Sequence, residues 1–437
     1  MKLLILPNQL FEPKYFPKEI DEIILYEHPQ YFTKYKFNKK KILLHRSSMK
    51  EYQDLLLKKK FKVKYLEFNN KFVYKNIEFI MFDPIDKLKI IERASNILES
   101  PNFLLTKNTY EIFRKKSDKF FFNSFYMNGK KIINIIPNVK SQDKLNRQKM
   151  PKNLEVPKLP KVKNDKYLKE ATQYVETHFK DNYGNIDNFI YPTNHKEAKV
   201  FLKHFIEKRF DKFGPYQDFM VQNKDYMFHS CLSSSINIGL INPLEIIEEI
   251  RKIQSKVPIN SYEGYIRQLF WREYQRYTYL YCDFSKNYFG NKKKLGKEWY
   301  DGTTGCDPVD YAIKSGFETG YLHHIYRLMV IGNYMNLNGI NPKEGFKWFM
   351  EFSCDSYEWV MYQNVLDMVF FVTGGKTMRK PYSSSSNYVL NMSDFKKGEW
   401  SKKWDILYRK FMENNVDKLW KFRYSFPALK KIKEGIK

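Results

Sequence analysis

The pattern of apolar and polar residues divides the chain into an N-terminal part of mixed structure and a C-terminal helical part. Up to residue 137, short apolar runs alternate with amphipathic stretches. The runs predict buried strands at Leu3–Leu6, Ile23–Tyr26, Ile42–His45, Val63–Leu66 and Phe79–Phe82. Between the third and fourth runs, Ser47–Lys60 predicts a helix, with Ser48 and Glu51 at the spacing of a capping box. Strands that alternate with helices indicate a doubly wound, parallel α/β domain.

The pattern changes after residue 137. Residues 138–166 are rich in Lys, Pro and Asn and show little periodicity, which predicts an interdomain linker. Beyond them, apolar residues recur at the spacing of amphipathic helices. They are Ala198, Phe201, Leu202 and Phe205 in one stretch, and Tyr262, Ile266, Leu269 and Phe270 in another. We therefore expect an α/β domain at 1–137, a linker at 138–166 and an all-helical domain at 167–437.

The chain is strongly basic. Its 437 residues include 76 Lys and Arg against 49 Asp and Glu, a formal net charge of +27. A charge of this size favours a polyanionic partner such as nucleic acid. An AT-rich genome would enrich lysine as well, so genome composition is the other interpretation.

Cysteine spacing and hydropathy set further expectations. Cys231, Cys282, Cys306 and Cys354 are dispersed, with no pair at zinc-ligand spacing. We expect a reducing, cytoplasmic setting, no disulfide framework and no metal site. No apolar run reaches the eighteen or so residues of a membrane span, and the strand-like run directly after Met1 predicts no secretory signal. No GxGxxG follows the first predicted strand, so a dinucleotide site there is unsupported.

Two adjacent histidines are candidate catalytic groups. On a helix, His323 and His324 would point about 100° apart and so could not share a task. His324 would face apolar and aromatic neighbours, whereas His323 would lie one turn from Arg327. A histidine beside an apolar, aromatic-rimmed pocket is a candidate acid or hydrogen-bond donor. A hydrogen-bonded core histidine is the alternative.

Three further stretches carry candidate binding groups. The Ser-rich run Phe228–Pro243 surrounds a predicted helix start, which suits a diphosphate or is an ordinary N-cap. Gln268 and Trp271 lie one turn apart on a predicted helix, where Arg272 and Arg276 form a second, basic row. An amide beside an indole suits an extruded nucleotide; a core helix with a buried Trp is the alternative.

The third stretch is Arg379–Tyr388 with the nearby Lys396 and Lys397. It combines basic groups, four serines and Tyr382, which are groups that position phosphates. A polar surface loop would have a similar composition.

Three motifs, taken in order, resemble the photolyase/cryptochrome superfamily. They are GYLHHIYRLMV, DSYEWVMYQNV and KPYSSSSNYVLNMSDFKKGEW. The resemblance is closest to the prokaryotic (6-4) photolyases, the iron–sulfur bacterial cryptochrome and photolyase branch. It runs from about Phe213 to Tyr408, with a weaker trace in the N-terminal third. It implies FAD in the helical domain and an antenna chromophore, often a lumazine, in the α/β domain.

The resemblance also implies a set of FAD-binding residues. They are His229, Ser230, Leu232, Ser233, Asn237, Tyr216, Arg327, Asp355 and Asn364. In the superfamily, the positions of Arg327 and Asp355 hold an ion pair beside the flavin ring, which would stabilise negative charge on reduced flavin. A plain salt bridge between helices is the other interpretation. Met361 stands where many photolyases place an Asn that faces flavin N5, so control of the N5 proton is open.

The lesion-side residues that the resemblance implies are His324, His323, Gln268, Trp271 and Tyr382. His324 matches the essential histidine of (6-4) enzymes, and Gln268 matches a position that is Glu in many cyclobutane-dimer enzymes. We therefore expect a monomeric, FAD-dependent DNA photolyase that flips (6-4) lesions out of UV-damaged duplex. Cyclobutane pyrimidine dimer repair, a cryptochrome-like blue-light photoreceptor, and a basic nucleic-acid-binding protein without flavin are the alternatives.

The chain departs from its nearest relatives in its cysteines and tryptophans. Those relatives hold a four-iron cluster on cysteines of the C-terminal helices. No cysteine follows Cys354 here, so we expect no iron–sulfur cluster. Val365 stands where common photolyases have the flavin-proximal Trp. Trp348 matches the inner Trp of the bacterial branch and Trp299 is a candidate outer partner, so we expect photoreduction through Trp348.

Overall fold

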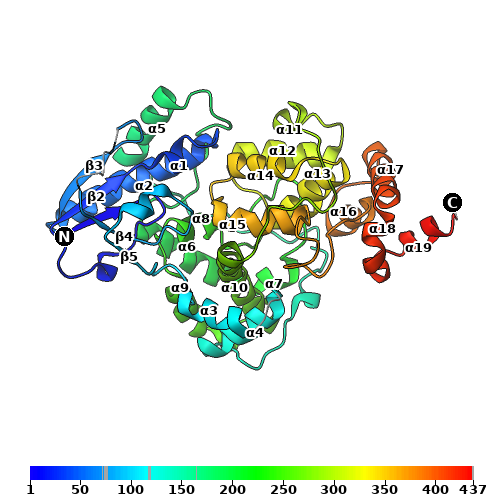
Figure 1. The fold of residues 1–437 in the computed structure, drawn as a ribbon, viewed down its shortest axis with the longest axis horizontal. Coiled ribbons are helices and arrows are strands. Elements are labelled where there is room, and N and C mark those ends of the chain that lie inside the picture. The colour runs from blue at the N-terminus through cyan, green and yellow to red at the C-terminus, as the bar shows by residue number, and fades with distance from the viewer. Residues whose placement is uncertain (71, 73–76, 117–119, 164, 436–437) are drawn as a thin grey trace.

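The N-terminal part of the protein is built on a five-stranded parallel sheet (Figure 1). The computed structural model describes residues 1–70, 72, 77–116, 120–163 and 165–435. The strands are β1 (Lys2–Ile5), β2 (Glu22–Tyr26), β3 (Lys62–Leu66), β4 (Ile80–Phe82) and β5 (Asn96–Leu98). Their order, β3-β2-β1-β4-β5 with every neighbouring pair parallel, is the predicted doubly wound arrangement.

Four of the five predicted strands are confirmed, and the strand predicted at Ile42–His45 is wrong. That run lies inside helix α2 (Lys39–Lys58), which begins where the Asn38 side chain accepts a hydrogen bond from the Lys40 backbone. Ser48 is therefore in the middle of a helix and forms no capping box. All four residues of the run are buried, and a fully buried helical turn gives the same apolar letters as a buried strand.

The polar groups at the carboxyl end of β2 bind one another. The Glu27 carboxylate accepts hydrogen bonds from Arg46, Tyr65 and Tyr174, and Arg46 comes from α2. Tyr174 lies on α5 (Lys166–His178), which packs against α2. The antenna chromophore that the resemblance implies for this domain stays a prediction.

Helices make up most of the remaining described chain. In order they are α1 (Pro29–Phe32), α3 (Lys107–Lys116), α4 (Phe122–Ile132), α6 (His195–Lys208), α7 (Phe210–Tyr216), α8 (Ser233–Asn237), α9 (Pro243–Arg251), α10 (Ile259–Tyr281), α11 (Glu298–Asp301), α12 (Asp307–Thr319), α13 (Asn333–Leu337), α14 (Pro342–Phe352), α15 (Glu358–Met361), α16 (Ser386–Met392), α17 (Glu399–Asn414), α18 (Val416–Leu419) and α19 (Ala428–Lys433). Two π-helical turns, η6 (Tyr326–Gly332) and η7 (Tyr362–Val369), and the 3-10 helix η8 (Trp420–Ser425) join them. Shorter 3-10 turns are η1 (Pro13–Tyr15), η3 (Lys89–Arg93), η4 (Asp143–Leu145) and η5 (Gln254–Lys256).

The predicted apolar stripes of α6 and α10 are buried, as expected. Beyond residue 166, the described residues form only two isolated bridges outside helices, Met220 with Ser393 and Lys293 with Ile340. The α/β part followed by a helical part confirms the predicted fold class. The ranges of the two domains and the linker stay a prediction.

Helix α10 lies between α15 and α4 in Figure 1. It packs against α4, α7, α9 and α15, so a helix from before residue 138 contacts it directly. The predicted linker is also anchored to it, because the Gln142 backbone N–H donates to Glu263 of α10. Residues from three stretches of the sequence thus meet around α10.

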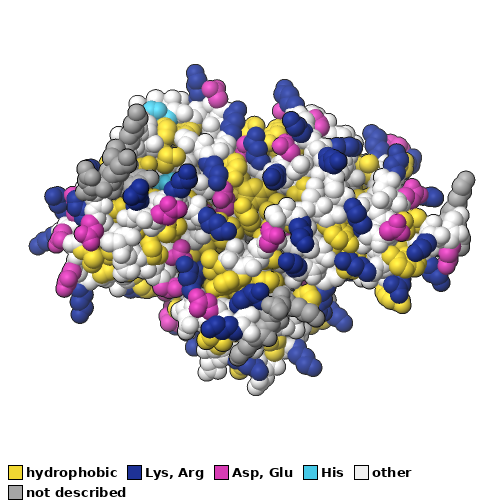
Figure 2. Space-filling view, in the orientation of Figure 1, with side chains coloured by type: hydrophobic (Ala, Val, Ile, Leu, Met, Phe, Trp, Pro, Cys, Tyr) yellow, Lys and Arg dark blue, Asp and Glu magenta, His cyan; other side chains and the backbone are white. Residues whose placement is uncertain are grey.

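No helix in the described residues is both long and apolar enough to cross a membrane. The four cysteines are free thiols. Figure 2 shows Lys and Arg side chains spread over the visible face among acidic and apolar ones, so the basic charge is distributed.

Candidate functional site

Asp355 ties the Ser-rich run to Arg327. Arg327 donates from Nη1 and Nη2 to the two carboxylate oxygens of Asp355, at 2.9 and 3.3 Å. The Ser233 hydroxyl donates to Asp355 Oδ2 (2.7 Å), and Asn237 Nδ2 donates to the Asp355 carbonyl (2.9 Å). Burial raises the pKa of Asp355, but Arg327 and the hydroxyls of Ser353 and Ser233 bring it below its usual value. The carboxylate therefore stays charged beside its cation.

The Ser-rich run also contains unused polar groups. The hydroxyls of Ser234 and Ser235 are buried and have no hydrogen-bond partner within the described residues. Buried polar atoms are normally hydrogen-bonded, so these two donors fit a site for an acceptor-rich group such as a diphosphate. The residues present thus fit the phosphates of FAD.

The second, basic row on α10, formed by Arg272 and Arg276, is covered by other parts of the chain. Arg276 is fully buried and pairs with Glu99 at 2.8 Å. Arg272 donates to Asn237 Oδ1 (2.9 Å) and lies over the Phe103 ring at 4.4 Å, and burial lowers its pKa to about 10. The reason is that the segment around Phe103, which precedes the linker, covers this face of α10. Arg272 therefore lies beside the Ser-rich run, a place that sequence spacing did not indicate.

The other predicted FAD residues have varied surroundings. Leu232 is fully buried, and the Ser230 hydroxyl accepts from the Leu232 backbone N–H at 3.4 Å. Asn364 Oδ1 accepts from Gln275 at 2.9 Å. Tyr216 packs near Phe228 in a separate small apolar cluster. The geometry joins Ser233, Asn237, Arg327 and Asp355 into one hydrogen-bonded group.

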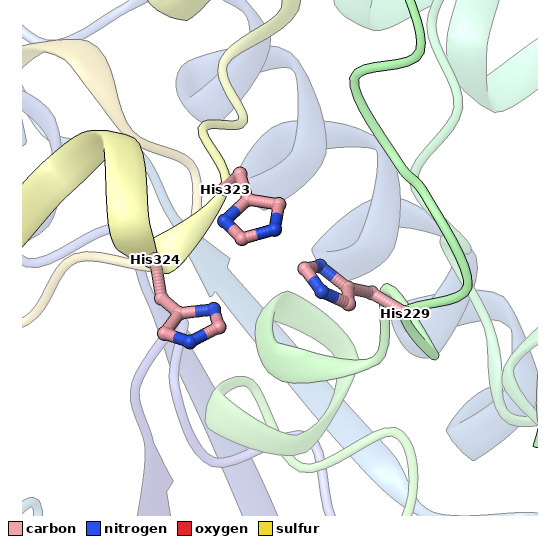
Figure 3. A group of neighbouring side chains, drawn as sticks. All are labelled: His229, His323 and His324. Carbon is pink, nitrogen blue, oxygen red and sulfur yellow. The ribbon is translucent and has the colours of Figure 1, made fainter. Parts of the chain in front are cut away.

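Three histidines meet in space (Figure 3). The ring centroids of His229 and His323 are 4.5 Å apart, and those of His323 and His324 are 4.8 Å apart with the rings nearly parallel. The expectation that His323 and His324 point apart on a helix is therefore wrong. Sequence spacing missed the third member, since His229 is 94 residues from His323.

A helix break before His324 explains the error. Gly320, with φ of +67°, ends α12, and a Cβ at this position would lie 2.6 Å from Cys354 Sγ. Residues 321–323 are then non-helical, and His323 Nδ1 accepts from the Ile325 backbone N–H at 3.0 Å, as an N-cap does. Only His324 lies on the following helical turn, so the two side chains do not follow helical spacing.

Hydrogen bonds fix the state of the two buried histidines. His229 Nε2 donates to the Gln217 carbonyl (3.1 Å), so Nδ1 accepts from the Tyr321 hydroxyl (2.8 Å). His323 uses Nδ1 as an acceptor, so Nε2 carries its proton, and that atom has no hydrogen-bond partner within the described residues. Burial lowers the pKa of His229 to about 3 and that of His323 well below its usual value. Both rings are neutral and have no free lone pair for a metal, and the absence of a metal stays a prediction.

His324 has a different environment. Its side chain is 44% exposed, and its Nε2 lies 3.1 Å from Asp218 Oδ1. Asp218 is only 8% exposed and also accepts from Arg147 Nε at 3.3 Å. Burial raises the pKa of Asp218, but His324 and Arg147 lower it below its usual value. The expectation that His324 faces apolar neighbours is thus wrong, because its side chain is partly exposed and contacts a buried carboxylate.

Sequence reasoning missed Asp218 and Arg147. Asp218 is 106 residues from His324, and Arg147 lies in the predicted linker. Tyr382 lies in the same neighbourhood. Burial and the nearby carboxylate of Asp143 raise the pKa of Tyr382, and Asp143 accepts a hydrogen bond from Arg147. A tertiary contact between distant segments leaves no spacing signal, so only the fold places these groups together.

Trp271, the indole predicted to contact the lesion, is stacked on another aromatic ring. Trp271 stacks on Phe122 of α4, with ring centroids 3.8 Å apart and planes 7° apart. Gln268 and Trp271 are both partly exposed on α10. Phe122 fixes the plane of the indole from one side.

A series of aromatic rings leads away from Arg327. The Arg327 guanidinium lies 5.2 Å from the Phe352 ring, which lies 4.8 Å from Trp348. Trp348 is fully buried and donates from Nε1 to the Trp299 carbonyl at 2.7 Å. The series continues from Trp299 to Tyr334 at 5.9 Å. The structure thus brings Trp348 and Trp299 together and connects them to the Arg327–Asp355 pair.

Comparisons with known families match most of the chain. The model for deoxyribodipyrimidine photo-lyase-related proteins matches residues 3–92 and 80–191. The model for the FAD binding domain of DNA photolyase matches residues 265–434.

Individual relatives agree with these matches. The chain is 36% identical over 295 residues to the (6-4) photolyase of Agrobacterium fabrum, a match over 63% of this chain and 58% of that protein, which is less than two thirds of its length. It is 55% identical over 91 residues to an uncharacterized protein of Acanthamoeba polyphaga mimivirus, over 21% of this chain and 74% of that one.

Solved structures share the fold. A bacterial class III photolyase from Agrobacterium tumefaciens superposes with a TM-score of 0.62 at 16% identity, over 100% of this chain and 92% of that chain. A Synechocystis cryptochrome superposes with a TM-score of 0.61 at 15% identity, over 96% and 89% of the two chains.

Proposed function

Because this chain belongs to the photolyase/cryptochrome superfamily, we propose that it is a FAD-dependent DNA photolyase that repairs (6-4) pyrimidine photoproducts in light. The observation that carries the (6-4) assignment is His324, which is the exposed member of the histidine cluster and is paired with the buried Asp218. The 36% identity to a (6-4) photolyase supports the same lesion type.

FAD would be held by the group around Asp355. Ser234 and Ser235 supply hydroxyls for the diphosphate, Ser233 holds Asp355, and Arg327 supplies a cation that its bond to Asp355 keeps in place. When bound, FAD supplies the electron that light drives onto the lesion. Arg327 is held in a site of low exposure, where its charge acts more strongly than it would in water.

Proton transfer to the lesion belongs to His324. Its side chain is exposed, and its Nε2 lies 3.1 Å from Asp218 Oδ1, so Asp218 orients the ring. His323 is buried and caps a helical turn, so it acts as a positioning residue that packs against the His324 ring. Tyr382, Gln268 and Trp271 are the candidate contacts of the flipped lesion in UV-damaged DNA.

Asp218→Asn tests this assignment. The substitution preserves shape but removes the negative charge of the group that His324 Nε2 contacts, so the imidazole is oriented less firmly. We expect repair to fall by about 10-fold or more while FAD content is unchanged. The measurement is the rate of light-driven (6-4) repair, with FAD counted on the same sample.

Asp310→Asn is the matched control, because Asp310 binds the Thr304 backbone N–H and hydroxyl in a surface turn away from the histidines. A repair rate of Asp218→Asn equal to that of the unaltered protein would contradict the role of Asp218.

Photoreduction through Trp348 gives a second test. Trp348→Phe replaces an oxidisable indole with a ring that is much harder to oxidise, while the aromatic packing around Phe352 is retained. With a thiol as the external reductant, we expect the light-driven reduction of bound FAD to slow by an order of magnitude or more. Absorbance at the flavin bands during illumination is the readout, and the same preparation is expected to contain no stoichiometric iron.

Trp420→Phe is the control, because Trp420 lies in the C-terminal segment outside the ring series. Equal reduction rates for Trp348→Phe and the unaltered protein would show that electrons take another path. Stoichiometric iron would contradict the predicted absence of a cluster.

A further inference from the structure

The C-terminal segment, residues 416–435, combines basic and aromatic side chains at the end of the molecule opposite the sheet (Figure 1). It consists of α18, η8 and α19, which pack against α17 and one another. It contains six Lys and Arg against two acidic residues. None of the histidines or FAD candidates lies in this segment, so the proposed repair site leaves it without a role.

Two aromatic rings in the segment are held by cations. The Arg423 guanidinium lies 4.6 Å from the Tyr424 ring centroid and 5.4 Å from that of Trp420. Arg423 Nη1 donates to the Trp420 carbonyl at 3.2 Å, which fixes the guanidinium between the rings. Lys433 Nζ lies 4.0 Å from the Trp420 ring centroid. Cation–π contacts of this kind orient a ring without covering both of its faces.

Tyr424 is 88% exposed, the largest exposure among the exposed large hydrophobic residues of the described chain. An isolated exposed tyrosine needs no explanation, but this one is held in place by Arg423 next to a second aromatic ring. The free face of Tyr424 is therefore a fixed, accessible platform.

The charge of the segment is largely unneutralised. Among the described residues, Lys430 is the segment's one cation within 4.0 Å of a carboxylate, that of Glu434. Lys431 and Lys433 are exposed and form no ion pair in the described part of the chain. Ammonium groups without carboxylate partners remain available for phosphates.

We propose that the segment binds single-stranded nucleic acid, with a base stacked on Tyr424 and with Lys431, Lys433 and Arg423 along the backbone. Alternating aromatic platforms and cations characterise surfaces that bind single strands without sequence preference. Intact duplex hides the faces of its bases, so a ring platform favours the single strand. This inference does not depend on the proposed repair activity.

The test uses the full chain in the dark and an undamaged 12-nucleotide oligo(dT), with affinity followed by fluorescence anisotropy over a salt titration. Tyr424→Ala removes the platform and is expected to weaken binding about 10-fold with the salt slope unchanged. Lys431→Gln/Lys433→Gln removes two charges and is expected to reduce the slope of log K against log salt by about 1.4. Tyr424→Phe keeps the ring and should bind normally.

The matched control is Lys292→Gln/Lys294→Gln, which removes two charges from an exposed lysine run outside the segment. Equal binding by Tyr424→Ala and the unaltered protein would overturn the proposal, since it would leave only nonspecific charge attraction. Equal loss in the Lys292/Lys294 control would also overturn it. So would binding to vesicles of anionic lipid without binding to oligo(dT).

Discussion

Asp355→Ala is expected to leave the protein with little bound FAD. The substitution removes the partner of both Arg327 nitrogens, so a cation that is only 16% exposed in its side chain loses its counter-charge. It also removes the acceptor of the Ser233 hydroxyl in the Ser-rich run. Breaking a buried pair by removing one partner costs about 3 kcal/mol or more, which corresponds to at least a 100-fold loss of affinity.

Flavin released by denaturation, counted per chain, measures this effect. Asp355→Asn retains the shape and one acceptor oxygen and should show an intermediate loss, which separates the charge from folding defects. Glu413→Ala removes the partner of Arg409 on the surface of α17, a kind of pair worth about 1 kcal/mol or less, and should keep its FAD. Full FAD occupancy in Asp355→Ala would mean that this group does not hold the cofactor.

His324→Ala is expected to abolish (6-4) repair while FAD content, photoreduction and DNA binding persist. The side chain is half-exposed and contacts the core mainly through the His323 ring, so its removal disturbs little of the fold. Loss of a positioned acid or base typically slows a reaction by about 10²- to 10⁴-fold. Repair rates under saturating light, with flavin content measured on the same sample, test this.

His323→Ala is the comparison variant that tells whether His323 or His324 is the proton donor. His323 is 2% exposed and caps a helical turn, so its loss should lower thermal stability and reduce repair only through displacement of His324. Unchanged repair in His324→Ala, or complete loss of repair in a stably folded His323→Ala alone, would contradict the assignment of the proton donor to His324.

Hydrophobic pattern predicted the stripe on α6 and the positions of strands β1 to β4, although β3 is only partly buried. The prediction at Ile42–His45 failed because a buried turn of α2 has the same apolar letters as the buried strands β1 and β2. Strand β5 was missed because Asn96–Leu98 is a short, half-exposed edge strand. Pattern alone does not separate a strand from a helix where a short run is buried on all sides.

The candidate site was predictable where family motifs fix single positions, and not where the tertiary fold brings distant positions together. The pairing of Arg327 with Asp355 was anticipated from motif positions. The approach of His229 to His323 and of Asp218 to His324 was not, because both depend on loops around Gly320 and Gln217. The burial of Arg272 was not predicted, because the segment that covers it precedes the linker.

The most direct test of the central claim is the repair of two defined substrates by the purified protein under blue light. One oligonucleotide duplex carries a single (6-4) photoproduct and the other a single cyclobutane pyrimidine dimer, and chromatography follows restoration of the intact bases. We predict light-dependent restoration of the (6-4) substrate, none in the dark, and little or none of the dimer. Restoration of the dimer alone, or of neither substrate by protein that contains reduced FAD, would contradict the account.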